Sequence, residues 1–432
     1  MSVAQSGKAR HFPNSPPFAT GLIGLLVFLL CFFFWSRGIA GSPTADFHLF
    51  LAVISGVMIL VDVLIFRVHR QPEVGIDWSG LAVSDIQITQ ALLPKIAAAA
   101  LMAGLTVLFY QTIDLYQDDW YRRFTGILLA YALPISAVLL VYIVGVDMLT
   151  QGREDGLSNL GVLVLSLGKR GNRRLAADFA LGWLVKLFFL PLMYGYALDD
   201  WLFFYGPGTT IDSFRAFYEF MYRFIFFTDV IFAIIGYCIA LRLLNSQVRQ
   251  PERTFSGWFI CLMCYMPFWQ VFGRSYFNFN GDFVWGPIFE PFPVLYVLWA
   301  SIILIALCCY LASTLAFGLR FSNLTYRGVV YRGTYSLTKH PAYLSKNLTM
   351  WMISLPFLAA SPGASLSNVL ALIGVNLIYY IRARHEETCC RSGRDYQIYE
   401  RFIRRHGAVA RIRAAGGRWV GGLQNQAALL RE

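Results

Sequence analysis

Two groups of polar residues in the C-terminal third of the chain could bind a ligand or act on one. The first group lies in residues 333–343 and includes the cation Lys339 and the imidazole of His340. The second is the carboxylate pair Glu386 and Glu387. Cationic or anion-binding groups on one side and two carboxylates on the other suit a ligand that carries both a carboxylate and an ammonium. These residue types therefore predict a site for an amino-acid-like group.

The apolar stretches between the two groups predict how they meet. Pro341 suits the first turn of a helix, because the N–H that proline lacks would have no partner there. A helix over 341–360 would rise about 30 Å at about 1.5 Å per residue. After a turn, a second helix over 366–385 would return the same distance. We therefore expect the two glutamates to lie at the membrane face that holds His340.

Composition places the whole chain in a membrane. Apolar residues make up 57% of its 432 residues and charged residues 14%, well below the roughly 25% of charged residues in soluble domains. Many apolar stretches approach the ~20 residues that cross a bilayer as a helix, and they lack the alternation of a transmembrane β-barrel. The predicted fold is an all-α, polytopic transmembrane bundle of about ten spans, over 18–36, 47–66, 92–112, 126–147, 175–198, 222–241, 255–273, 293–317, 341–360 and 366–381.

The basic residues predict the orientation of this bundle. If the N-terminus is cytoplasmic, Lys and Arg gather in the loops that then face the cytoplasm, as the positive-inside rule requires. An even number of spans places both termini in the cytoplasm. The net charge of +11 then predicts contact with anionic lipid headgroups and not with nucleic acid. We expect a multi-pass protein of a bacterial inner membrane, or an equivalent cellular membrane, with the candidate site facing the cytoplasm.

The chain divides unevenly around residue 250. Residues 1–250 hold six predicted spans and no recognisable catalytic spacing, whereas residues 251–432 hold the candidate site and an arginine-rich cytoplasmic tail. Lys186 and Asp229 fall inside predicted spans, where charges are expensive. We expect them to form an ion pair; the alternatives are a substrate or proton pathway, or no contact between the two side chains. Asp147, at the end of a span, is expected to lie in solvent.

The eight cysteines do not form a disulfide or zinc framework. Cys261 and Cys264 have the C-x-x-C spacing, but they lie in an apolar stretch without a second such pair. We interpret them as small core residues and predict no metal site.

The polar spacing of the C-terminal part resembles a family of integral membrane enzymes, the isoprenylcysteine carboxyl methyltransferases and the related phospholipid N-methyltransferases. In that family a Gly-x-Tyr precedes an Arg-His-Pro-x-Tyr motif, a Glu-Glu pair follows one helical hairpin later, and the tail carries spaced tyrosines. The resemblance covers about residues 314–406. The corresponding residues here are Gly333, Tyr335, Lys339-His340-Pro341-Ala342-Tyr343, Glu386-Glu387, Tyr396 and Tyr399.

The resemblance implies that S-adenosylmethionine binds in a cytoplasm-facing cleft formed by the hairpin and the tail. His340 and Glu387 are the catalytic residues that it implies. The residues that it implies as cofactor contacts are Tyr335, Lys339, His340, Pro341, Tyr343, Glu386, Glu387 and Tyr396. The implied acceptor is a lipid or a lipidated, isoprenylcysteine-like molecule. Lysine replaces the usual arginine at position 339, and six extra N-terminal spans precede the family's small core, so the identity of the acceptor stays open.

Methyl transfer from a sulfonium can proceed without a catalytic dyad. A carboxylate acceptor is already ionised at neutral pH, so alignment can supply most of the acceleration, and a dry site strengthens the electrostatic interactions. An amine acceptor would have to lose a proton, for which His340 or a glutamate is suited.

Other interpretations of the same residues stay open. Lys339, His340 and the two glutamates could simply anchor helix ends at the membrane surface. The NADPH-dependent sterol and steroid reductases share a distantly related architecture, but they typically have Asn before the motif tyrosine and Gly-Asp after it, where this chain has Ala342 and Leu344-Ser345. A transporter or a non-enzymatic scaffold would explain the large N-terminal part. The oligomeric state is not predicted.

Overall fold

The computed structural model describes residues 17–35, 41–78, 92–150, 154–205, 211–279 and 284–412. Both chain termini, including residues 413–432 of the arginine-rich tail, lie outside the described residues. Within the described part the chain is mostly helical, with one pair of very short strands. The all-α prediction is therefore confirmed.

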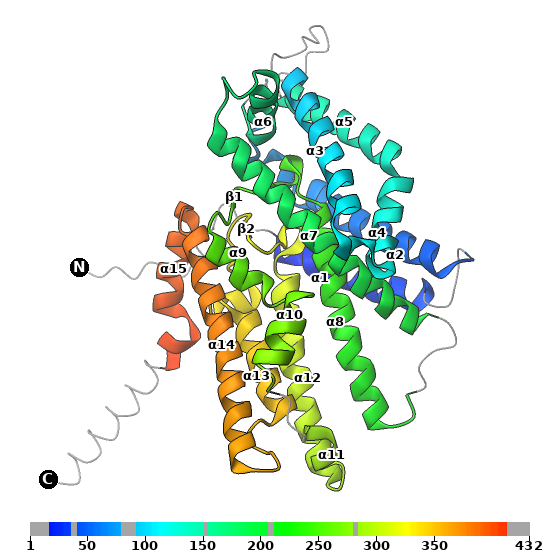
Figure 1. Cartoon of the computed structure of the whole chain (residues 1–432), viewed down its shortest axis with the longest axis vertical. Helices are drawn as coiled ribbons and strands as arrows, with labels where there is room; N and C mark the ends of the chain where they lie inside the picture. Colours follow the sequence, from blue (N-terminus) through cyan, green and yellow to red (C-terminus); the bar gives the residue numbers. More distant parts are fainter. Residues whose placement is uncertain are drawn as a thin grey trace, which may run out of the picture.

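The α-helices are α1 (Phe18–Trp35), α2 (Pro43–Leu60), α3 (Leu92–Thr112), α4 (Asp119–Ala130), α5 (Ala132–Leu149), α6 (Gly156–Leu165), α7 (Arg173–Phe204), α8 (Phe214–Cys238), α9 (Phe255–Leu262), α10 (Phe268–Val271), α11 (Trp285–Phe289), α12 (Pro293–Leu315), α13 (Pro341–Ser354), α14 (Pro362–Cys390) and α15 (Arg394–His406) (Figure 1). The 3₁₀ and π-helical segments are η1 (Val61–Ile65), η2 (Val68–Arg70), η3 (Pro72–Val74), η4 (Asp114–Gln117), η5 (Arg242–Leu244), η6 (Phe272–Tyr276), η7 (Gly318–Arg320) and η8 (Gly333–Ser336). Strands β1 (Gln250–Pro251) and β2 (Thr325–Tyr326) pair antiparallel, with Gln250 opposite Tyr326.

Eight of the described helices are long and apolar enough to cross a membrane. They are Phe18–Trp35, Pro43–Ile65, Leu92–Thr112, Ala132–Leu149, Arg173–Phe204, Phe214–Cys238, Pro293–Leu315 and Pro362–Cys390. This finding supports a multi-pass helical membrane protein. Two of the ten predicted spans have no single long helix to match them.

The first of these is the stretch 255–273, which was predicted as one helix. α9 ends at Leu262, and α10 begins only after Pro267. Proline has no N–H to donate and its ring clashes with the preceding turn, so a helix does not run through it undisturbed. The prediction of a continuous helix is therefore wrong here.

The second is α13, which is shorter than the predicted 341–360. The helix ends at Ser354, and Leu355 takes a left-handed conformation with φ 41°; Leu355 precedes Pro356, and a residue before proline avoids the helical region. The 14 residues of α13 rise only about 21 Å, whereas the 29 residues of α14 rise about 43 Å. The hairpin therefore has unequal arms, and α14 exceeds the ~30 Å of a bilayer core.

Contacts between helix ends show how the chain alternates between the two ends of the bundle. At one end, Lys95 pairs with Asp147 at 2.8 Å, and the Asn245 amide donates to the Gln71 side chain at 2.8 Å. At the other end, the Tyr205 hydroxyl donates to Asp46 at 2.7 Å. These contacts join loops that the sequence analysis places on the same membrane face.

Between β1 and α12 the chain passes from one end of the bundle to the other. β1 lies at the end that holds the candidate site. Phe277, which follows η6, lies beside Gly374 in the middle of α14. Glu290, which follows α11, lies 3.4 Å from Arg215 at the start of α8, at the opposite end. The described parts of this passage are short helices.

The parts before and after residue 250 share one hydrophobic core. Phe28 of α1 and Phe232 of α8 belong to the same buried cluster as Leu315 of α12 and Leu319 of η7. The N-terminal helices therefore pack directly against the element that leads into the candidate site.

The predicted ion pair between Lys186 and Asp229 is not formed. The Asp229 carboxylate accepts hydrogen bonds from the hydroxyls of Tyr310 and Thr314 on α12. The Lys186 ammonium lies 5.8 Å from the centroid of the Trp183 ring. The prediction of a solvated Asp147 is also wrong, because this side chain is 1% exposed and pairs with Lys95.

Candidate functional site

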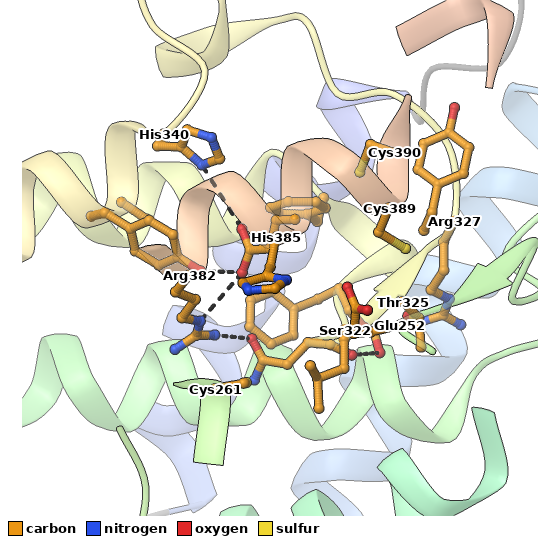
Figure 2. A pocket seen from close by; sticks show the side chains of 18 of the residues that line it. Glu252, Cys261, Ser322, Thr325, Arg327, His340, Arg382, His385, Cys389 and Cys390 are labelled. Carbon is orange, nitrogen blue, oxygen red and sulfur yellow. Dashed lines mark hydrogen bonds and ion pairs between the residues drawn. The ribbon is translucent and has the colours of Figure 1, made fainter. Parts of the chain in front are cut away.

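A cavity lies where the start of α13 meets the last turns of α14 (Figure 2). It holds about 170 Å³ of space that the centre of a water molecule can reach. Side chains from α9, α12 and residues 320–328 complete its wall. The ionisable Glu, Lys, Arg and His side chains that line it are Glu252, Arg320, Arg327, His340, Lys346, Arg382, His385 and Glu386.

The structure brings only part of the predicted cofactor site to this cavity. The predicted residues that line it are Tyr335, His340, Tyr343 and Glu386. The remaining predicted residues, Lys339, Pro341, Glu387 and Tyr396, lie outside its lining.

The start of α13 has the predicted geometry. Pro341 is in the first turn and His340 is the N-cap residue. The imidazole of His340 stacks on the Tyr343 ring, with centroids 5.6 Å apart and planes 3° apart. His340 Nε2 lies 3.2 Å from Glu387 Oε1. The expectation that the hairpin returns the glutamates to His340 is therefore confirmed.

Glu387 is enclosed by positively charged side chains. Lys339 Nζ lies 2.8 Å from its carboxylate, and Arg384 and Arg391 each approach to 3.2 Å. The Glu387 side chain is 5% exposed. The basic residues and the glutamate thus contact one another directly, without a gap for a ligand between them in this structure. Glu387 fixes the His340 ring from behind the cavity wall.

Glu386 is the carboxylate of the pair that faces the cavity. The Tyr343 hydroxyl donates to its Oε1, Arg382 Nε lies 3.3 Å from the same oxygen, and His340 Nδ1 lies 3.8 Å from Oε2. Its side chain remains 34% exposed. Glu386 therefore has lone pairs available for a ligand, whereas Glu387 is surrounded by protein.

Arg382 links the hairpin to the opposite wall. Its Nη2 donates to Asn323 Oδ1 at 2.7 Å, and the Asn323 amide donates to the hydroxyls of Tyr237 and Tyr265 at 2.7 and 2.9 Å. Its guanidinium lies 5.3 Å from the Tyr265 ring and 5.2 Å from the Tyr343 ring. The protein therefore engages Nε and Nη2 of this arginine.

Lys346, unlike Arg382, contacts aromatic rings rather than hydrogen-bond acceptors. Its ammonium lies 5.6 Å from the Tyr379 ring and 6.0 Å from the Tyr310 ring. Within the described part of the chain, no hydrogen bond or ion pair engages this ammonium. Lys346 therefore has all three N–H donors available to a ligand in the cavity.

Arg327 holds the loop wall in place. Its guanidinium donates to the carbonyl oxygens of Ser246, Gly236 and Ile239 at 2.6 to 2.8 Å, and to that of Phe321 at 2.8 Å. Burial lowers the pKa of Arg327 to about 9, which still leaves it charged at neutral pH. These four carbonyls use four of its five N–H donors, so Arg327 supports the wall.

The tail helix α15 supports the site from outside. Tyr396 and Tyr399 pack in a buried cluster with Tyr326, Val329 and Cys389. The Tyr399 hydroxyl donates to the Tyr335 carbonyl at 2.8 Å. Tyr396 thus lies in the packing between α15 and the site wall rather than in the cavity.

The sequence analysis did not single out Arg382, Lys346 or Asn323. Arg382 stands one helical turn before Glu386, and Lys346 stands one turn after Ala342. A basic residue inside an apolar stretch was the available signal, since such a residue at membrane depth usually faces the protein interior. Asn323 had no comparable signal, because its role depends on contacts with distant helices.

The described residues contain no group of three or more His, Cys, Asp or Glu placed to hold a metal ion. Comparisons of the chain with family models, with curated proteins and with solved structures found no match.

Proposed function

We propose that this protein is an integral membrane, S-adenosylmethionine-dependent methyltransferase that acts on a lipid or lipidated, isoprenylcysteine-like acceptor. The observation that carries the proposal is the cavity at the foot of the α13–α14 hairpin, which is lined by His340, Tyr343 and Glu386 of the resembling motif. We further propose ten membrane crossings with both termini in the cytoplasm, and a site facing the cytoplasm of a bacterial inner membrane or an equivalent membrane. The basic residues that gather at this end of the bundle support that orientation.

The residues of the cavity fit the charges of S-adenosylmethionine. Glu386, which is partly exposed, can accept hydrogen bonds from the ammonium of the methionyl group. Lys346 can bind its carboxylate, and nearby tyrosine rings attract a cation through their faces. When bound, the cofactor would supply an electrophilic methyl group on a sulfonium.

The protein would contribute mainly alignment. Glu387 holds His340 and Lys339, and Glu386 holds Tyr343, so the wall beside the ligand is fixed before binding. Such preorganisation lowers the cost of reaching an in-line geometry. For an amine acceptor, His340 is the cavity-lining imidazole that could take the proton. Glu387, implied by the resemblance as catalytic, is better supported as a positioning residue.

The charges of the cavity give less support to an NADPH-dependent reductase. NADPH carries three phosphate groups, which proteins usually bind with several basic side chains. Arg327 is occupied by backbone carbonyls, and Arg382 is bound to Asn323 and Glu386. Besides these two, the lysine and arginine side chains that line the cavity are Lys346 and Arg320, a small basic complement for so many phosphates.

The proposal is tested by ligand-dependent thermal stability of the detergent-purified protein. S-adenosylhomocysteine should raise the melting temperature, and NADPH should not. Glu386→Gln should reduce the shift, whereas Glu219→Gln, at an exposed glutamate 63% accessible to solvent, should leave it unchanged. A shift with NADPH alone would favour the reductase, and the absence of any shift would favour a scaffold or transporter.

A further inference from the structure

The helix α15 has two faces of opposite character. Its inward face carries Tyr396, Tyr399, Phe402 and Ile403, which pack against Tyr326, Val329 and Cys389. Its two acidic residues also turn inward: Asp395 accepts from the Tyr326 hydroxyl, and Glu400 pairs with Arg391 and Lys339 at 2.7 and 3.3 Å. The apolar and acidic side chains of this helix thus contact the rest of the protein.

The outward side is strongly basic. Its exposed arginines are Arg394, Arg401, Arg404 and Arg405, and the exposed Arg411 follows the end of the helix at His406. No carboxylate of the described chain forms an ion pair with these arginines. Ile398 of the helix is 38% exposed, and Val409 and Ile412, which follow the helix, are 62% and 70% exposed. A cationic surface with interspersed apolar groups has the chemistry that complements an anionic membrane surface.

The position of α15 matches the headgroup layer. The part of α14 before Arg382 carries no Asp, Glu, Lys, Arg or His and has about the length of a bilayer core. The charged residues of α14 follow within its last nine positions, 382–390, which therefore extend beyond the hydrocarbon. α15 begins at Arg394, four residues after Cys390 (Figure 1), so its start lies beyond the part of α14 that has the length of a bilayer core.

The same helix contacts the site through a chain of ion pairs. Glu400 of α15 and Glu387 of α14 share both Lys339 and Arg391. Glu387 in turn holds His340 at the cavity wall. Contacts that hold α15 against the protein would therefore stabilise the groups that orient His340.

We propose that the outward arginines of α15 bind the headgroups of anionic phospholipids, and that this contact holds α15 against the Lys339–Glu387–Glu400 network. Anionic lipid would thereby favour the ligand-binding form of the cavity. The lipid contact is independent of the chemistry proposed above, while its effect on cofactor affinity rests on the proposed function.

The test uses the full-length protein in nanodiscs of phosphatidylcholine, with or without about one third of phosphatidylglycerol. Hydrogen exchange of residues 394–412 should slow at least tenfold with phosphatidylglycerol, since each arginine near an anionic surface contributes roughly a fivefold gain in binding. The effect should vanish at about 1 M salt, where screening is nearly complete. It should also vanish in the triple variant Arg401→Gln/Arg404→Gln/Arg405→Gln.

The matched control is Arg170→Gln/Arg173→Gln/Arg174→Gln, which makes the same change of net charge at exposed arginines elsewhere on the protein. This control should keep the lipid-dependent protection of α15. Equal exchange in both lipids, or equal loss in both triple variants, would overturn the proposal. Protection by soluble polyphosphate but not by phosphatidylglycerol would overturn it as well, since the surface would then recognise a soluble polyanion.

The effect of the lipid on the site is measured separately, as the affinity for S-adenosylhomocysteine. S-adenosylhomocysteine should bind several-fold more tightly in phosphatidylglycerol discs than in phosphatidylcholine discs, and the difference should disappear in the α15 triple variant. Equal affinity in both lipids would overturn the coupling. If the ligand binds in neither lipid while α15 is still protected, the proposed cofactor fails and the lipid contact stands.

Discussion

Adjacent glutamates at the foot of the hairpin should respond in opposite ways to the same substitution. Glu387 is 5% exposed and accepts from Lys339 at 2.8 Å and His340 at 3.2 Å. A hydrogen bond to a charged group contributes about 1.5–3 kcal/mol, and Gln would retain one neutral acceptor. The remaining arginine partners are 38% and 52% exposed, so solvent screening leaves them little weight. We therefore expect Glu387→Gln to lower the free energy of unfolding by about 2–3 kcal/mol.

Glu386→Gln should change the stability little and weaken ligand binding. The amide oxygen can still accept from Tyr343 and Arg382, so the loss of stability should stay below about 1 kcal/mol. A ligand ammonium, however, would lose its anionic partner. Since about 1.4 kcal/mol is a tenfold change in affinity, S-adenosylhomocysteine should bind roughly tenfold more weakly or worse.

Both variants are measured by thermal unfolding in detergent over a range of S-adenosylhomocysteine concentrations. Glu387→Gln should melt earlier and retain a ligand-dependent shift, whereas Glu386→Gln should melt near the wild-type temperature with a reduced shift. Wild-type stability of Glu387→Gln would contradict the role of Glu387 as a buried structural acceptor. Loss of the ligand-dependent shift in Glu387→Gln, with the shift kept in Glu386→Gln, would contradict the placement of Glu386 in the binding site.

Three further predictions concern the scaffold. Asp229→Leu should cost about 2 kcal/mol or more, because the hydroxyls of Tyr310 and Thr314 lose their acceptor. Lys186→Met should change the melting temperature little, and equal losses in the two variants would instead support an ion pair between Lys186 and Asp229. Arg391 lowers the pKa of Glu400 below its usual 4.5, so the stability that Glu400 contributes is complete above about pH 4.5 and is lost as the pH falls through its folded-state pKa. The melting difference between wild type and Glu400→Gln should accordingly be constant near neutral pH and shrink in acid, and a difference that grows in acid would contradict this sign. A Cβ at Gly161 would lie 1.8 Å from a backbone oxygen of α3, while one at Gly126 meets nothing within 4 Å. Gly161→Ala should therefore lower the free energy of unfolding by about 1–3 kcal/mol or more, and Gly126→Ala should raise it by up to about 1 kcal/mol. Equal effects would rule out close packing of α3 on α6.

The parts of the fold that follow from local sequence were predictable. Hydropathy and length identify the long helices, and counting residues along the hairpin brings Glu387 back to His340. The break before α10 also had a local signal in Pro267, which the sequence analysis passed over. Such features depend on the residues of one segment and its neighbours.

The parts that depend on distant contacts were not predictable. The direct pairing of Lys339 with Glu387 at 2.8 Å requires the exact rotation of α13 against α14. The assignment of Glu386 to the cavity and Glu387 to the network follows from the same rotation, since residues one apart on a helix face different directions. The wall around Asn323 exists because β2 pairs with β1, about 75 residues earlier in the chain.

The most direct test of the account is methyl transfer itself. Purified protein, reconstituted with a total lipid extract and given S-adenosylmethionine labelled in its methyl group, should move the label into an organic-soluble product, and the rate should fall at least tenfold in Glu386→Gln. The proposed activity is contradicted if the folded protein leaves the lipid fraction unlabelled and S-adenosylhomocysteine fails to raise its melting temperature.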